Sequence, residues 1–170
     1  EPLDNYIPED FQSAIGALPQ EGLREVARAL SQALEGAGEQ REDYWKNRVQ
    51  PFWQKIWPKM RDLASNNIAE SLARLSIAAG GEFPAALSAV RDWLRPIVHP
   101  DYIVHKLHES DLAGRFPADT LSLLSSVIEN QPWPPSELRQ CLTAVEKAAP
   151  ALVQDQRYQK LMQYLRRHGI

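Results

Sequence analysis

The sequence predicts an all-α fold, built as a helix-turn-helix stack of a divergent HEAT-like or other α-solenoid type. Apolar residues recur at steps of three and four along almost the whole chain, and no segment alternates as a half-buried strand does. Clusters of proline or glycine separate these apolar stripes at short intervals, so neighbouring helices are expected to be antiparallel. A proline-containing motif also returns at an even spacing, as a chain of two-helix repeats would require.

The apolar spacing predicts about nine helices, with bounds defined to about three residues. In order, they span residues 8–17, 20–35, 40–57, 66–79, 84–95, 101–112, 117–129, 135–148 and 151–167. Six of them carry clear stripes, which are Leu23/Val26/Leu30/Leu34, Ile68/Leu72/Leu75, Leu87/Val90/Leu94, Leu121/Leu124/Ile128, Leu138/Cys141/Leu142/Val145 and Tyr158/Leu161/Leu165. The third helix contains Pro51, which must kink or divide it because proline lacks the backbone donor.

Breaks between the helices are marked by residues that end or bend helices. These are Gly36–Gly38, Gly80-Gly81, Pro96–Pro100, Gly114 and Gln131–Pro135. The expected organisation is therefore a single helical domain, 1–170, with N-terminal helices in 1–38 and helical repeats in 39–170.

The repeat is indicated by Phe83-Pro84-Ala85, which returns as Phe116-Pro117-Ala118 and then, at the same step, as Pro150-Ala151. Pro51 lies one equal step earlier. Proline suits the first helical turn, whose N–H groups have no intrahelical partner, so the motif predicts a recurring helix start. Thirteen prolines leave coincidence as the alternative. The characteristic motifs of ankyrin and tetratricopeptide repeats are absent from the sequence.

Composition restricts the classes of partner. The 170 residues are 44% hydrophobic and 24% charged, with a formal net charge of −3 and interleaved signs, so we expect neither nucleic acid nor an anionic membrane as the partner. No apolar run is long enough to predict a membrane-spanning helix. A single cysteine, Cys141, favours a reducing compartment, and the predicted location is cytoplasmic.

The ends of the chain predict a fragment of something longer. The sequence begins at Glu1 without methionine and finishes with Arg166-Arg167-His168-Gly169-Ile170, a composition typical of a helix end. We therefore expect the C-terminal piece of a larger protein. A processed or trimmed full-length protein is the alternative.

Four short motifs stand out between Trp45 and the C-terminus, namely Phe52-Trp53-Gln54-Lys55-Ile56-Trp57-Pro58, Ala78-Ala79-Gly80, Phe116-Pro117 and Tyr158-Gln159-Lys160-Leu161. With these motifs, the stretch from Trp45 onward resembles a C-terminal helical domain of large bacterial phage-defence proteins. In that family the domain follows catalytic domains such as sirtuin-type NADases or NTPases. The resemblance implies a role in antiviral defence, with any enzyme upstream of Glu1. It carries over no catalytic residue.

One cluster has the residue types of a metal site. Asp101, His105, His108 and Glu109 share one face of the predicted helix 101–112, where two imidazoles and two carboxylates can converge. A metal-binding protein or metal-dependent hydrolase using His105, His108 and Glu109 is therefore the alternative function. A solvated polar face has the same pattern, and the leading prediction includes no metal, cofactor or catalytic residue.

The aromatic cluster supplies the candidates for partner binding. On a continuous helix Trp45, Trp53 and Trp57 would lie along one side, as a buried seam or as a contact surface. We expect Trp53 and Trp57 to join the N-terminal helices to the first repeat. The sequence thus predicts a non-catalytic interaction, sensing or scaffolding module. Its expected partner is another protein, other domains of its parent chain or a second copy of itself.

Overall fold

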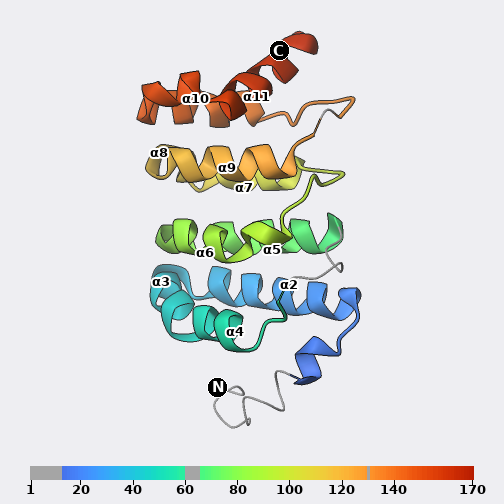
Figure 1. Ribbon diagram of the computed structural model, residues 1–170. Helices are drawn as coiled ribbons and strands as arrows, with labels where there is room; N and C mark the ends of the chain where they lie inside the picture. The colour runs from blue at the N-terminus through green and yellow to red at the C-terminus, as the bar shows by residue number, and fades with distance from the viewer. Residues whose placement is uncertain (1–12, 60–65, 130) are drawn as a thin grey trace.

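The computed structural model describes residues 13–59, 66–129 and 131–170, and within these ranges the chain is helical, without a strand (Figure 1). The predicted all-α class is confirmed. The helices are α2 (Gln20–Gly36), α3 (Arg41–Tyr44), α4 (Gln50–Lys55), α5 (Asn66–Ala78), α6 (Phe83–Val90), α7 (Asp101–Glu109), α8 (Leu112–Arg115), α9 (Pro117–Val127), α10 (Leu138–Ala148) and α11 (Gln156–Arg167). Residues 13–16 are also helical, and the rest of the helix predicted at 8–17 lies outside the described residues.

The helices are arranged in successive layers along one direction (Figure 1). The first layer holds α2, α3 and α4, the second α5 and α6, the third α7, α8 and α9, and the fourth α10 and α11. Helix α5 packs on α2 below it and on α7 above it, and α10 packs on α8 and α9. Each layer therefore contacts mainly the layers next to it in sequence.

The helix predicted at 40–57 is continuous from Arg41 to Lys55 but widens in the middle. Trp45–Val49 form a π-helical turn, η3, in which the backbone N–H of Gln50 donates to the carbonyl of Trp45. Pro51 follows directly, in the first turn of α4. Because Pro51 has no N–H to donate to the preceding turn, a local change in winding accommodates it, and the helix is neither ended nor divided there.

Helix α5 is buried on two opposite faces. Its residues Ile68, Leu72 and Leu75 belong to a core shared with the first layer. Its residues Ala69, Ala73 and Ile77 belong to a second core, shared with the third and fourth layers. The apolar residues of α5 thus form two faces, one packed on the first layer and one packed on the third, as expected for an inner helix of a stack.

The turn after α5 depends on Gly80, as its sequence position predicts. Gly80 has φ +62°, in the left-handed region that favours glycine. A Cβ at this position would lie 2.6 Å from Cδ of Arg41, so a larger residue would also press on the first layer. The three-residue 3-10 turn η4 (Gly80–Glu82) then leads into α6.

Three of the predicted helices are divided, which corrects the sequence expectation. The segment 84–95 is α6, which ends at Val90, followed by the 3-10 turn η5 (Arg91–Trp93). The segment 101–112 ends as α7 at Glu109, because Asp111 has φ +56° and starts the short helix α8 in a new direction. The segment 151–167 is a 3-10 helix, η6 (Pro150–Gln154), followed by α11. Between them Asp155 has extended backbone, with ψ 133°.

The four evenly spaced prolines all lie in the first turn of a helical segment. They are Pro51 in α4, Pro84 in α6, Pro117 in α9 and Pro150 in η6. The last three begin the second half of their layers. The predicted helix starts are therefore present at Pro84 and Pro117. Pro150 begins a 3-10 segment instead of an α-helix, and Pro51 lies within the helix that is continuous from Arg41 to Lys55.

Asp155 caps α11. Its carboxylate accepts a 2.8 Å hydrogen bond from the backbone N–H of Arg157 and pairs with the guanidinium of the same residue at 2.8 Å. The side-chain and backbone hydrogen bonds from Arg157 lower the pKa of Asp155 to about 2. The charged carboxylate is thus the form that the folded protein prefers.

We expect Asp155→Ala to lower the melting temperature near neutral pH. The difference in melting temperature between wild type and variant should become smaller as the pH falls. The pKa of Asp155 is depressed on folding from an ordinary value of about 3.9, so its stabilisation is present above about pH 4 and is lost toward pH 2. Thermal melts of both proteins across this range test the prediction. Asp155→Asn is the matched control, because asparagine keeps a capping oxygen without the charge. A difference between wild type and Asp155→Ala that is unchanged at pH 2 would contradict it.

Candidate interaction surface

The three tryptophans predicted to share one side of a helix have different environments. Trp45, in the π-helical turn, is completely buried. Trp57 is also buried, whereas Trp53 is half-buried. The first-layer core contains Trp45 and Trp57, and Trp53 packs against its edge. A buried seam is therefore the main role of this cluster, and a partner-binding role for Trp45, Trp53 or Trp57 stays a prediction.

Trp53 and Trp57 join the first layer to the second. Their rings stack with centroids 4.5 Å apart and an interplanar angle of 14°. The Trp53 indole N–H donates a 3.1 Å hydrogen bond to the carbonyl of Ala89 in α6. Trp57 contacts the edge of Trp93, in the 3-10 turn after α6, with centroids 5.8 Å apart. These contacts join α4 and the residues directly after it to α6 and the turn that follows α6, whereas the repeat expected to begin there stays a prediction.

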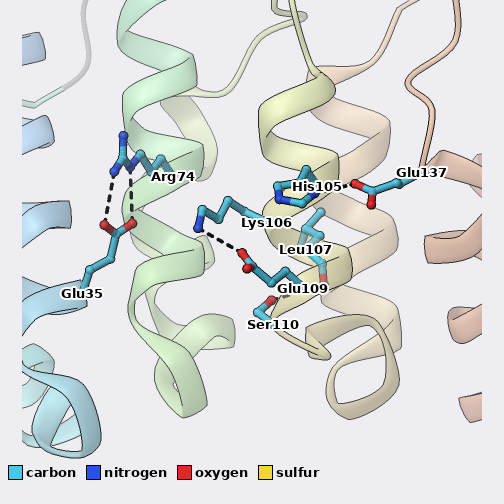
Figure 2. A network of polar contacts seen from close by, with 8 residues as sticks. All are labelled: Glu35, Arg74, His105, Lys106, Leu107, Glu109, Ser110 and Glu137. Atoms are coloured by element: carbon cyan, nitrogen blue, oxygen red, sulfur yellow. Dashed lines mark hydrogen bonds and ion pairs between the residues drawn. The ribbon is translucent and has the colours of Figure 1, made fainter.

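The polar side chains of α7 have separate partners, one in the next layer and one within the helix (Figure 2). Nδ1 of His105 lies 2.8 Å from Oε2 of Glu137, near the start of α10. Glu109 instead accepts a 3.0 Å hydrogen bond from Lys106, on the side of α7 that faces α5. This bond from Lys106 also lowers the pKa of Glu109. The side chains of His105 and Glu109 thus point toward different partners.

The other two predicted ligands are also separated from this pair. His108 is exposed in the last turn of α7, and Asp101 is exposed in its first turn, where it lines a different cavity. Among the residues that the structure describes, no group of three or more His, Cys, Asp or Glu side chains is placed to hold a metal ion. Asp101, His105, His108 and Glu109 therefore share a helix without being brought together as a ligand set.

Cys141 is completely buried in the second core, as its position in an apolar stripe predicts. Its thiol donates weakly to the carbonyl of Val104, 3.6 Å away. Burial, assisted by the negative charge of Glu137, raises the pKa of Cys141 to about 12. The reactive thiolate is therefore suppressed at neutral pH.

We expect Cys141 to resist alkylation in the folded protein. At about pH 8 iodoacetamide should leave native Cys141 unmodified over minutes, because both the thiolate population and access are low, and should modify it rapidly in urea. Mass spectrometry of intact protein measures both rates. Rapid modification without denaturant would show that the thiol is accessible and would overturn the assignment of Cys141 to packing.

Sequence reasoning missed the most exposed aromatic residue of the described chain. Trp133 is 83% exposed, and Val98 is 62% exposed. Trp133 lies in the connection between the third and fourth layers, and Val98 in the connection between the second and third. Both connections run along the same side of the stack (Figure 1). Residues 96–99, 101, 129 and 131–133 form this surface, which we call the loop edge.

Hydrogen bonds hold the two connections together. The N–H of Ile97 donates to the carbonyl of Val127 at 3.0 Å, and the side-chain amide of Gln131 donates to the carbonyl of Ile97. The hydroxyl of Tyr164 in α11 donates to the carbonyl of Gln131 at 3.1 Å. The loop edge is thus tied to the third and fourth layers, which presents Trp133 and Val98 on a supported backbone.

A cavity of about 510 Å³ opens between the two connections. Buried Ile97 belongs to its lining, together with the exposed side chains of Val98 and Trp133. Asp101 and Glu129 are the carboxylates that line it. The available sequence signal was a tryptophan between prolines, Pro132-Trp133-Pro134, inside a predicted helix break. Periodicity identifies core residues and therefore gave this position no role.

Comparisons with known proteins place the chain beside an uncharacterised bacterial protein. The uncharacterized protein y4cA of Sinorhizobium fredii (strain NBRC 101917 / NGR234) is 31% identical over 134 residues, which cover 75% of this chain. The aligned region is 11% of that protein, so the chain corresponds to about a tenth of its relative. No family model matches the chain, and no solved structure does. None of the helices in the described ranges has the length and apolar character needed to cross a bilayer.

Proposed function

We propose that this chain is a non-catalytic α-solenoid module of a larger cytoplasmic protein, and that its loop edge binds a protein partner or another domain of its parent chain. The exposed pair Trp133 and Val98 carries the proposal. Exposing large apolar side chains to water is unfavourable in free energy, so a group of them at a surface often marks a binding site. Tryptophan is also enriched where proteins bind one another. Here both side chains border one cavity on a hydrogen-bonded backbone.

The layered arrangement supports the solenoid part of the proposal. Successive layers pack mainly on their sequence neighbours, and α5 is buried on two faces, as an inner repeat would be. The evenly spaced prolines lie in the first turn of a helical segment, one in each layer. The much greater length of the relative supports a module within a larger protein. A setting in antiviral defence stays a prediction from the resemblance.

Site-specific photo-crosslinking tests the interaction surface. A benzophenone amino acid at position 98 should give a discrete adduct in host cells, and the same group at Gln140, on the exposed face of α10, should not. Adding Trp133→Ala to the chain labelled at position 98 should remove the adduct. Equal adducts from both positions, or none from position 98, would reject the loop edge as the binding surface.

A further inference from the structure

The charge of the loop edge restricts what can bind there. Asp101 and Glu129 are exposed and line the same cavity, together with His99, and no lysine or arginine is among the described residues that line it. Glu129 also lines a second cavity, which Arg157 and Lys160 border, so Asp101 is the carboxylate that faces the first cavity alone. Neither carboxylate takes part in an ion pair in the described part of the chain. Glu35, in contrast, is paired with Arg74 at 3.2 Å (Figure 2). The cavity is thus a site where a bound ligand can supply the counter-charge.

The aromatic surface beside these carboxylates favours the same sign of ligand. A tryptophan ring attracts a lysine or arginine cation through its negative face, and the exposed ring of Trp133 has that face available. Val98 and Ile97 provide apolar contact in the same cavity. The combination of apolar wall, exposed indole and two carboxylates suits a ligand that is both cationic and apolar.

Resting on the proposed function, we propose that the loop edge binds a short peptide segment of a partner protein in which lysine or arginine adjoins an apolar residue. The apolar side chain packs on Val98 and Trp133, and the cation lies against Trp133 with Asp101 and Glu129 as counter-charges. A cavity of about 510 Å³ has room for a few side chains, which matches a short segment. A second copy of this chain fits less well, because symmetric pairing of two loop edges would bring four carboxylates together.

Selection from a displayed library of random dodecamer peptides tests the charge preference directly. The full chain should enrich peptides with lysine or arginine next to an apolar residue. Asp101→Asn/Glu129→Gln should weaken a selected peptide about threefold to tenfold, since exposed ion pairs contribute modestly. Trp133→Ala should weaken it by about tenfold or more, because a central aromatic residue dominates such contacts. Glu39→Gln, an exposed carboxylate in η2 (Gly38–Gln40), is the matched control and should change nothing.

The outcomes separate this inference from the proposed function. Trp133-dependent peptides without a basic preference would overturn the charge assignment and leave the interaction surface intact. Selection of acidic peptides by Asp101→Lys/Glu129→Lys would support the assignment. The absence of any Trp133-dependent peptide would overturn both proposals. A dimer in sedimentation analysis that Trp133→Ala dissociates would assign the loop edge to a second copy and reject the peptide.

Discussion

Replacing Trp45 by alanine is expected to lower the free energy of unfolding by about 3–5 kcal/mol, as is usual for a large aromatic residue removed from a core. Trp45 is completely buried in the first core, where α2, α4 and α5 also contribute side chains. For a chain of this size each kcal/mol lowers the melting temperature by about 2–4 °C. Urea unfolding followed by circular dichroism measures the loss, and Trp45→Phe should recover part of it.

Trp133→Ala, in contrast to Trp45→Ala, is expected to leave the stability of the protein almost unchanged. Because 83% of Trp133 is exposed, its truncation should change the free energy of unfolding by no more than about 0.5 kcal/mol. Equal losses for Trp45→Ala and Trp133→Ala would mean that one of the two environments is assigned incorrectly. A folded Trp133→Ala protein is also the condition for using it in the binding experiments.

The helices with a regular stripe and a clear break could be predicted closely from the sequence. The segment predicted at 20–35 is α2, Gln20–Gly36, and the segment predicted at 66–79 is α5, Asn66–Ala78. Both have a continuous apolar stripe and a following glycine. In such segments the local preference and the burial agree, so one sequence is enough to place them.

Backbone reversals within a stripe could not be predicted in this way. Leu107 and Leu112 are both buried, yet the chain turns at Asp111 between them. Apolar spacing records which side chains face the core and is insensitive to one residue with positive φ. Asp155 was a recognisable capping residue type, but its role became clear only from its bonds to Arg157.

The contacts of the candidate site residues could not be predicted from sequence spacing either. Spacing along α7 correctly places His105 and Glu109 on one helix. It does not reveal that His105 pairs with Glu137 from the next layer, while Glu109 pairs with Lys106 on α7 itself. Likewise, a tryptophan in a loop is exposed or buried according to elements distant in sequence. Near Trp133, the loop is held by the bonds of Gln131 to Ile97 and Tyr164, which sequence spacing does not reveal.

Trp57→Ala is expected to cost about 3–5 kcal/mol of unfolding free energy, and Trp53→Ala only about 1–3 kcal/mol. Trp57 is buried and contacts both Trp53 and Trp93, so its removal leaves a cavity between the first two layers. Trp53 is half-buried, and its truncation removes one stacked face and the 3.1 Å hydrogen bond to Ala89. Chemical unfolding of both variants measures the difference.

A double-mutant cycle on Trp53 and Trp57 tests whether the stacked pair itself stabilises the junction. An aromatic pair contributes about 0.5–1.5 kcal/mol beyond the area that it buries, so the double variant should lose less than the sum of the single losses by that amount. The ring geometry, with centroids 4.5 Å apart and planes at 14°, is of the stacked kind. Trp53→Phe should keep most of the coupling while losing the bond to Ala89. Strictly additive losses would show that each tryptophan packs independently, and equal single losses would contradict the half-buried environment of Trp53.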